Sequence, residues 1–152
     1  MIRARGFELI RDYLNSGLFL PTRSTVGSAG YDISAAQSIC LAKREKVLIP
    51  TGIKVYMQPN EYLGIHIRSG LAVKHGLYLS NGQGIIDSDY YNNPDNEGHI
   101  LIALVNGGER NFLVERGMRI AQGIFYNYLT VDQDQLTHKD LRTGGIGSTG
   151  SL

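Results

Sequence analysis

Residues 46–57 read KVLIPTGIKVYM, and this stretch decides the fold class. Its apolar residues stand at every second position on both sides of a break: Val47, Ile49, Ile53, Val55 and Met57. A period of two is typical of β-strands, because successive side chains point to opposite faces of a sheet. The break, Pro50-Thr51-Gly52, contains the two strongest turn residues. The stretch therefore predicts two short strands joined by a tight connection.

Three further stretches carry strand signals, and one carries a helix signal. Residues 62–67 (YLGIHI) alternate, and residues 119–129 (RIAQGIFYNYL) are β-branched and aromatic. Residues 100–105 (ILIALV) are continuously apolar but too short for a helix, so we expect a strand buried on both faces. Residues 68–76 (RSGLAVKHG) predict one short helix, with Ser69 as N-cap and Gly76 as left-handed C-cap. This helix is either a simple connector or, at its N-terminus, an anion site.

Composition limits the class of protein. The chain has 152 residues, of which 42% are hydrophobic and 19% charged, enough for one domain with a core. Its 19 glycines point to many tight turns, as in an all-β fold. The net charge of +1 argues against binding duplex nucleic acid, and a single cysteine excludes an internal disulfide. The N-terminal residues resemble neither a signal peptide nor a membrane span, so we expect a cytoplasmic protein without nucleic-acid or membrane partners.

Residues 145–150 (GIGSTG) spell G-x-G-x-x-G. That pattern marks a dinucleotide site only where a strand precedes it and a helix follows. Only Ser151 and Leu152 follow here, so we expect neither the helix nor the dinucleotide site.

Five polar, glycine-rich clusters interrupt the expected strands: SAGYDISAA (28–36), RSGLAVKHG (68–76), GQGIIDSDY (82–90), RGMRIAQG (116–123) and RTGGIGSTG (142–150). Each alone has an ordinary explanation as a turn, an exposed edge or a chain end. Taken in this order, however, they resemble the five motifs of the trimeric dUTPases, over about residues 20–150. The most specific parts are AGYD (29–32), RSGLA (68–72) and GIIDSDY (84–90).

The resemblance implies an all-β, jelly-roll-like, distorted β-barrel that forms a homotrimer with shared active sites. It also implies Mg²⁺-dependent hydrolysis of dUTP to dUMP and pyrophosphate. Residues 1–141 would form the barrel domain, and residues 142–152 a flexible glycine-rich lid. One chain would supply Asp32, Ser69 and Gln122 to a site, a second chain the Asp87 hairpin and a third chain the Arg142 segment.

The resemblance further assigns the chemistry. Asp87 matches the general base that takes a proton from the attacking water, with Asp89 as a nearby alternative. Gln122 matches the amide that holds this water. Asp32 matches a carboxylate that reaches Mg²⁺ through water, in keeping with the tendency of Mg²⁺ to retain several water ligands.

Two sets of residues would bind the substrate. The triphosphate would be bound by cationic, hydroxyl, amide and backbone N–H groups: Arg68, Ser69, Gly70, Arg119, Gln122, Arg142, Gly147 and Ser148. Uracil and deoxyribose would be bound by a second set: Asn81, Gly84, Ile86, Asp87, Tyr90 and Ile146. The hairpin backbone would match the uracil edge, which cytosine does not reproduce. The ring of Tyr90 would lie where a 2′-hydroxyl clashes.

Two features depart from the family pattern. Ile146 stands where an aromatic residue usually stacks on uracil. Residues 91–99 (YNNPDNEGH) are an insertion, expected as an exposed loop that is either inert or, at 91–98, a surface for a protein partner. Two alternatives stay open. One is a dCTP deaminase-like enzyme of the same fold, which would use a glutamate and lack the Asp87–Tyr90 hairpin. The other is a dUTPase with a second, regulatory protein-binding role.

Overall fold

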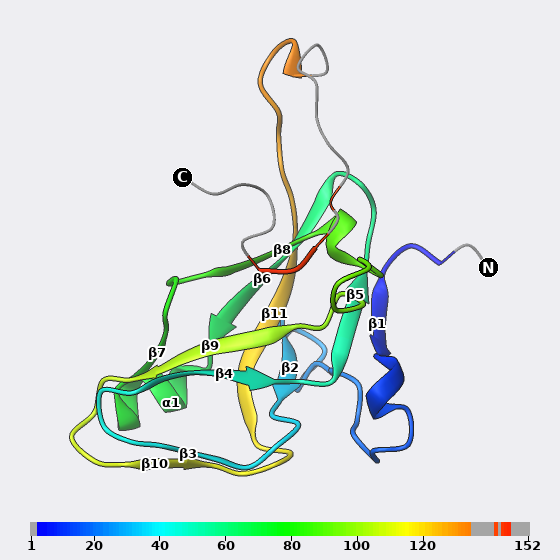
Figure 1. Ribbon diagram of the computed structural model, residues 1–152. Helices are drawn as coiled ribbons and strands as arrows, with labels where there is room; N and C mark the ends of the chain where they lie inside the picture. Colours follow the sequence, from blue (N-terminus) through cyan, green and yellow to red (C-terminus); the bar gives the residue numbers. More distant parts are fainter. Residues whose placement is uncertain (1–2, 135–141, 143, 147–152) are drawn as a thin grey trace.

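The computed structural model describes residues 3–134, 142 and 144–146, and this part of the chain is built mainly from β-strands (Figure 1). In chain order the strands are β1 (Gly6–Leu9), β2 (Tyr31–Ser34), β3 (Ile39–Leu41), β4 (Lys46–Pro50), β5 (Ile53–Tyr56), β6 (Glu61–Ile67), β7 (Leu77–Leu79), β8 (Gly84–Asp87), β9 (Leu101–Asn106), β10 (Phe112–Val114) and β11 (Arg119–Asn127). The described residues also include α1 (Ser69–His75) and two 3-10 helices, η1 (Arg11–Tyr13) and η2 (Ser88–Tyr90). The predicted all-β class with one short α-helix is confirmed.

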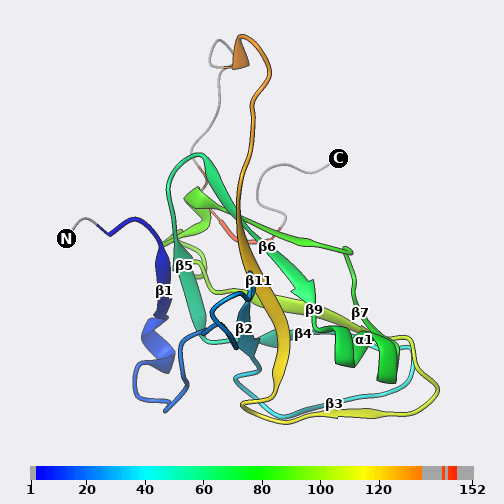
Figure 2. The ribbon, with the colours of Figure 1, turned by 180° about the vertical axis from the view of Figure 1, so that it is seen from behind.

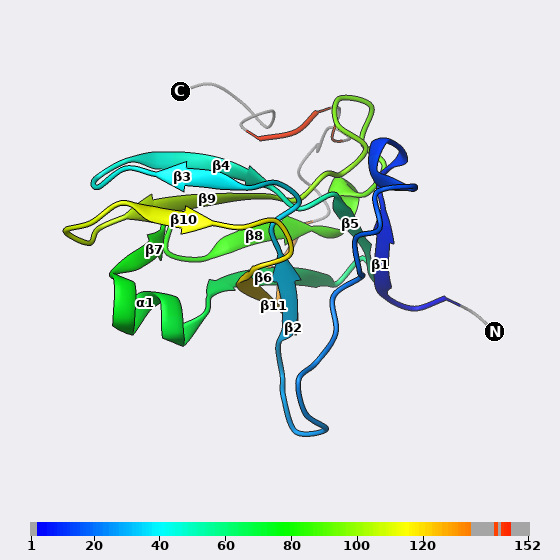
Figure 3. The same cartoon turned by 90° about the horizontal axis from the view of Figure 1, so that it is seen from below.

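The strands pair in antiparallel sheets that face one another. The largest sheet has the order β2-β11-β6-β8, and a second has the order β4-β9-β7. Strand β1 pairs with β5, and β3 pairs with β10. Figure 3 shows β3, β4, β9 and β10 on one side of the molecule and β6 and β11 on the other, and Figure 2 shows β11 between β2 and β6 from behind. In the described residues the ladders do not close into a ring, so the arrangement is that of a distorted jelly roll with facing layers.

The core lies between these layers. Ile33 of β2 and Leu63 of β6 are fully buried on one side, and Ile49 of β4 and Leu104 of β9 are fully buried on the other. Burial of one such side chain contributes about 1.5–3 kcal/mol, so side chains from both layers hold the sheets together. Residues 46–57 form β4 and β5 as predicted, and the chain turns between them at Gly52 with φ +72°. Only glycine adopts that conformation without steric cost.

Two details differ from the sequence-based expectations. In β9, Ile102 and Leu104 are buried in the core, but Leu101 and Ala103 on the opposite face are only half-buried. The expectation of burial on both faces is wrong because the second face lines a pocket. Ser69 is the first residue of α1 rather than its N-cap, a position that Arg68 takes. Gly76 closes the helix in the left-handed conformation at φ 67°, as predicted.

No helix in the described ranges is long and apolar enough to cross a membrane.

Candidate active site

The residues singled out from the sequence gather in two groups, and Asp87 of one group and Gln122 of the other lie near opposite ends of β6. At one end, β8 pairs with β6 so that Asp87 lies opposite Tyr62. At the other end, β11 places Gln122 opposite His66, and Asp32 of β2 pairs with Gln122 in turn. We call the first group the hairpin half: Asn81, Gly84, Ile86, Asp87 and Tyr90, together with Arg142 and Ile146. We call the second group the arginine half: Asp32, Arg68, Ser69, Gly70, Arg119 and Gln122.

In the arginine half, one carboxylate holds two guanidinium groups. Oδ2 of Asp32 accepts hydrogen bonds from Nη1 of Arg119 at 2.9 Å and from Oγ of Ser24 at 2.8 Å. Its Oδ1 lies 3.3 Å from Nε of Arg68. The Asp32 side chain is only 13% exposed, whereas that of Arg119 is 53% exposed. The cluster therefore carries one net positive charge, and its arginines face solvent, where they can meet an anion.

A glycine makes room for Gln122. A Cβ atom at Gly30 would lie 2.3 Å from Oε1 of Gln122, closer than any real contact. Gly30 and Asp32 belong to the same AGYD motif, so this motif supplies both a carboxylate and the space for the neighbouring amide. A side chain at residue 30 would force the amide of Gln122 out of its present position.

The first turn of α1 completes the arginine half. Ser69 and Gly70 are exposed, and they line a shallow depression of about 560 Å³ with Arg68 and Arg119. Lys74 of the same helix also lines it. Sequence reasoning missed this further cation, although Lys74 lies in the same motif. The depression thus brings three positively charged side chains beside a hydroxyl group.

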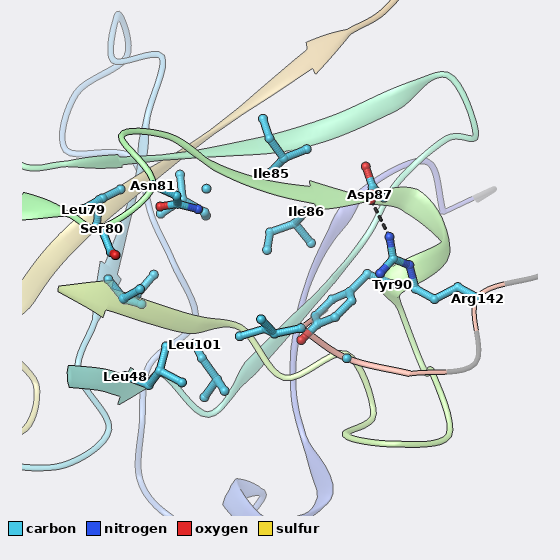
Figure 4. Close-up of a pocket in the computed structure, with 16 residues that line it drawn as sticks. Leu48, Leu79, Ser80, Asn81, Ile85, Ile86, Asp87, Tyr90, Leu101 and Arg142 are labelled. Atoms are coloured by element: carbon cyan, nitrogen blue, oxygen red, sulfur yellow. Dashed lines mark hydrogen bonds and ion pairs between the residues drawn. The ribbon is translucent and has the colours of Figure 1, made fainter. Parts of the chain in front are cut away.

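The hairpin half surrounds a pocket of about 380 Å³ (Figure 4). All of the residues proposed for uracil and deoxyribose line it: Asn81, Gly84, Ile86, Asp87, Tyr90 and Ile146. The facing sheet adds an apolar wall that includes Leu48 and Leu101, which Figure 4 shows across from Ile86. Sequence reasoning missed this wall, and the only signal for it was the apolar second face of β9. A planar apolar ring fits such a pocket.

At the rim of this pocket, Arg142 binds the two aspartates of the hairpin. Its Nη2 donates to Oδ2 of Asp87 at 2.5 Å (Figure 4). Its Nε donates to Oδ1 of Asp89 at 2.9 Å. The guanidinium carbon also lies 5.7 Å from the ring centroid of Tyr90. The resemblance implied that Arg142 reaches another chain's site, but in this single chain it lies on its own hairpin. Which hairpin it covers in an assembly stays a prediction.

Tyr90 is fixed from behind by the insertion that follows it. The side chain is 6% exposed, and its hydroxyl group donates to the carbonyl of His99 at 2.9 Å and accepts from Nδ2 of Asn96 at 2.8 Å. Asn93, at the centre of the insertion, is 5% exposed. The expectation of an exposed loop holds for Asn92, Pro94 and Asp95, but Asn93 and Asn96 turn inward and contact Tyr90. Gly147 and Ser148 lie outside the described residues.

Within one chain, Asp87 of the hairpin half and Gln122 of the arginine half are far apart. Tyr62 and His66, the partners of Asp87 and Gln122, are four residues apart along β6, or about 13 Å. Two strand spacings add about 10 Å across the sheet, so the Cα atoms of Asp87 and Gln122 lie on the order of 16 Å apart. Two groups that hydrogen-bond to one water lie within about 6 Å of each other. Asp87 and Gln122 of the same chain therefore cannot act on the same water molecule.

Comparisons with known proteins agree with this geometry. The family model described as dUTPase matches residues 18–150. The deoxyuridine 5'-triphosphate nucleotidohydrolase of Lactococcus lactis is 48% identical over 150 residues, covering 99% of this chain and 100% of the relative. That of Rickettsia felis is 43% identical over 86% of this chain and 88% of its own length. A crystal structure of the Streptococcus mutans dUTPase superposes with a TM-score of 0.79 at 46% identity, covering 84% of this chain and 98% of that one.

An apolar pocket with a carboxylate at its rim and an arginine cluster on the same all-β scaffold suit an enzyme whose substrate carries both a ring and anionic groups. Within that class, the chain belongs to the dUTPase family. This membership decides against the dCTP deaminase alternative.

Proposed function

We propose that this chain hydrolyses dUTP to dUMP and pyrophosphate, as a cytoplasmic homotrimer whose sites combine the Asp87 hairpin of one copy with the arginine half of a second and the Arg142 segment of a third. The observation that carries the proposal is the hairpin pocket, in which an apolar cavity, an open strand edge and the carboxylate of Asp87 adjoin one another. Residues 1–141 would form the catalytic domain, and the segment from Arg142 onward would cover the bound nucleotide.

Uracil would be recognised by the backbone of β8. Among the residues that the structure describes, this strand is the edge of its sheet, because it pairs only with β6. The N–H and C=O groups on the other side are free to pair with a base, in the way that edge strands accept partners. Cytosine carries a donor where uracil carries an acceptor, and it would leave a buried group unpaired. The ring of Tyr90 would lie beneath the deoxyribose and exclude a 2′-hydroxyl group.

The reaction is an attack of water on the α-phosphorus. Asp87 would take the proton from that water while Gln122 of another copy orients it. The bond between the α-phosphorus and the bridging oxygen breaks, and pyrophosphate leaves. Arg68, Arg119 and the hydroxyl group of Ser69 would stabilise the charge on the phosphate oxygens. Both Asp87 and Arg119 have exposed side chains, so substrate can reach them.

The residues of the arginine half fit an indirect contact with Mg²⁺. In the described ranges no three His, Cys, Asp or Glu residues are grouped to hold a metal ion. A single carboxylate, Asp32, suits a cation that retains its water ligands and is held mainly by the phosphates of the substrate. When bound, the cation would neutralise charge on the triphosphate.

Assembly follows from the separation of the halves. Because Asp87 and Gln122 are on the order of 16 Å apart in one chain, a complete site needs a second copy. A cyclic trimer repeats the same contact three times, so that every site has the same composition.

The test is a pyrophosphate-release assay with dUTP, dCTP, dTTP and UTP, each with and without Mg²⁺. We expect rapid release from dUTP with Mg²⁺ and very little from the other three nucleotides. Comparable turnover of dCTP or UTP would contradict recognition by the hairpin.

A further inference from the structure

The insertion after Tyr90, residues 91–98, has a defined structure of its own. Asn92 and Glu97 adopt left-handed backbone conformations, at φ 55° and 64°. The N–H of Asn92 donates to the carbonyl of Glu97 at 3.1 Å, and the N–H of Glu97 donates to the carbonyl of Asn93 at 2.9 Å. Backbone bonds that close a loop on itself hold it in one shape.

The insertion is also tied to the sheet beneath it. Nζ of Lys54 in β5 donates to Oδ1 of Asn92 at 2.7 Å and to Oε1 of Glu97 at 2.6 Å. Lys54 is only 8% exposed, and the main-chain N–H of Arg11 adds a bond to Oε2 of Glu97 at 3.1 Å. The hydrogen bond from Lys54 holds the pKa of Glu97 below its usual value, so the Glu97 carboxylate is charged near neutral pH. A buried, charge-assisted anchor of this kind fixes the position of the loop.

From this fixed loop, Asn96 reaches Tyr90. Its Nδ2 donates to the Tyr90 hydroxyl group at 2.8 Å. Its Oδ1 accepts from Nδ2 of Asn93 at 2.8 Å and from the N–H of Gly98 at 3.0 Å, so both ends of the amide are held. The Tyr90 hydroxyl group in turn donates to the carbonyl of His99. The ring that lines the pocket is therefore held from both sides of its hydroxyl group.

The neighbouring residue, Asp95, receives the C-terminal segment. Its Oδ2 accepts the N–H of Gly145 at 3.1 Å. Gly145 is buried, and a Cβ atom there would lie 3.0 Å from both Oδ2 of Asp95 and Nδ2 of Asn96. Such contacts are tighter than nearly all real ones, so the segment approaches the loop closely because residue 145 is a glycine. Ile146, the next residue, lines the pocket.

We propose that residues 91–98 are a positioning element of the nucleotide pocket, in which Asn96 fixes the ring of Tyr90 and Asp95 seats the C-terminal segment at Gly145. The loop thereby sets the preference for deoxyribose and the affinity for substrate. This inference rests on the proposed function, since it assigns roles in the binding of dUTP. It concerns residues that touch Tyr90 and Gly145 rather than the reacting atoms.

The role of Asn96 is tested by the ratio of kcat/KM for dUTP to that for UTP. Asn96→Ala should lower this ratio about tenfold, because a small displacement of Tyr90 admits the 2′-hydroxyl group. In a Tyr90→Phe background, which has already lost the same hydrogen bond, Asn96→Ala should change the ratio by less than about twofold. Asn111→Ala is the matched control, because Asn111 is exposed and bonds to the N–H of Lys43 instead. The ratio of kcat/KM for dUTP to that for UTP in Asn111→Ala should equal the wild-type ratio.

An unchanged ratio in a folded Asn96→Ala variant would overturn the role of Asn96, as would equal losses in both backgrounds. If Asn96→Ala does not fold, Tyr90→Phe decides alone. It keeps the ring but removes both hydrogen bonds of the hydroxyl group, including the one from Asn96, so an unchanged ratio in that variant would also overturn the role of Asn96.

The role of Asp95 is tested by the KM for dUTP in chains with and without residues 142–152. Asp95→Ala should raise KM by roughly threefold to tenfold in the full chain and have no further effect in the shortened one. Asp95→Asn, which keeps a carbonyl acceptor, should recover most of the affinity. Glu109→Ala is the control, since that carboxylate is 81% exposed and pairs only with Lys43 among the described contacts. An equal change of KM on Asp95→Ala in the full and the shortened chain, or no change in either, would overturn the proposed role of Asp95 in holding Gly145.

The two proposals fail in different ways. A wild-type protein that releases no pyrophosphate from dUTP would remove the proposed function and the role of the loop with it. An active wild type with unaltered Asn96 and Asp95 variants would remove only the role of the loop.

Discussion

The arginine half and the hairpin half differ in how the fold holds them. The arginine half takes Arg119 and Gln122 from the interior strand β11, Asp32 from the adjoining strand β2, and its remaining residues from the first turn of α1. Asp32 there already binds both of its arginines. The hairpin half stands on the edge strand β8, and it is completed by the insertion and by Arg142 and Ile146 from a remote part of the chain.

This difference suggests that the two halves bind different parts of the substrate. Groups that are already fixed by ion pairs to one carboxylate suit a ligand of constant shape and charge, such as a triphosphate. An edge strand with a covering segment suits a ligand that must be distinguished from similar molecules. Both the free backbone groups of the strand and the covering segment can favour one base over another. Neither half is a complete site by itself, since about 16 Å separates Asp87 from Gln122.

The largest effect is expected from removing the base in the hairpin half. Asp87→Asn keeps the shape of the side chain but cannot accept a proton, so turnover should fall by about 10²–10⁴. Affinity for a non-hydrolysable dUTP analogue should change little. The measurements are kcat by pyrophosphate release and binding by calorimetry.

Asp89→Asn is the matched control, because Asp89 binds the same Arg142. We expect it to retain most of the activity. If Asp89→Asn loses the rate and Asp87→Asn keeps it, the base is Asp89.

The next largest effect should come from uncovering the hairpin half. Deletion of residues 144–152 removes the seat at Gly145 and the cover at Ile146, and turnover should fall roughly a hundredfold because substrate is no longer held in position. The core residues all lie earlier in the chain, so the thermal midpoint and the assembled mass should be retained. Loss of assembly would show that the segment is structural.

A smaller effect is expected from replacing the aliphatic side chain at position 146 with an aromatic one. Ile146 is 69% exposed and lines the pocket. Ile146→Phe would add stacking on uracil, which contributes about 1–3 kcal/mol per base elsewhere and less where the side chain is partly solvated. We expect the affinity for dUTP to tighten by a modest factor in equilibrium binding. Unchanged or weaker binding would mean that the cover closes in another way.

The smallest effect concerns the pH dependence of stability at His99, the residue whose carbonyl accepts the Tyr90 hydroxyl group. Nε2 of His99 accepts the N–H of Gly52 at 2.9 Å, which requires a neutral ring, and burial lowers the pKa of His99 below its usual 6.5. A folded-state pKa below the unfolded value means that this contribution to stability is complete above about pH 6.5 and is lost as the pH falls toward the folded pKa. Thermal midpoints should therefore decline by a few degrees from pH 7 to pH 5.5. His99→Gln should show a flatter profile, and an equal decline in that variant would assign the effect elsewhere.

The sequence predicted β4, β5, β6, β9 and β11 because alternation and residue type are local, whereas the contents of both halves came from the resemblance of the five motifs to a family. Alternation at 46–57 reports a period of two, and each motif keeps its residues within one turn or strand. The face of a strand that meets a pocket is not local, and for this reason the apolar wall at Leu48 and Leu101 was missed.

The structure of the insertion was missed for the same reason. Alternation places Lys54 on the opposite side of β5 from Ile53 and Val55, which suggests exposure. Burial of Lys54 instead depends on Asn92 and Glu97, 38 and 43 residues later in the chain. Polar composition indicates a loop, but the direction of its side chains depends on what the loop covers.

The central claim is that one site combines Asp87 of one chain with Gln122 of another, and refolding two variants together tests it most directly. Asp87→Asn and Gln122→Ala chains, each nearly inactive alone, are unfolded, mixed in equal amounts and refolded, and pyrophosphate release from dUTP is measured. Random assembly makes about three quarters of trimers mixed, and each mixed trimer has one intact site in three, so about a quarter of wild-type activity should return. Activity no higher than that of the separate variants, with mixed trimers shown to form, would place both residues of a site in the same chain and contradict the account.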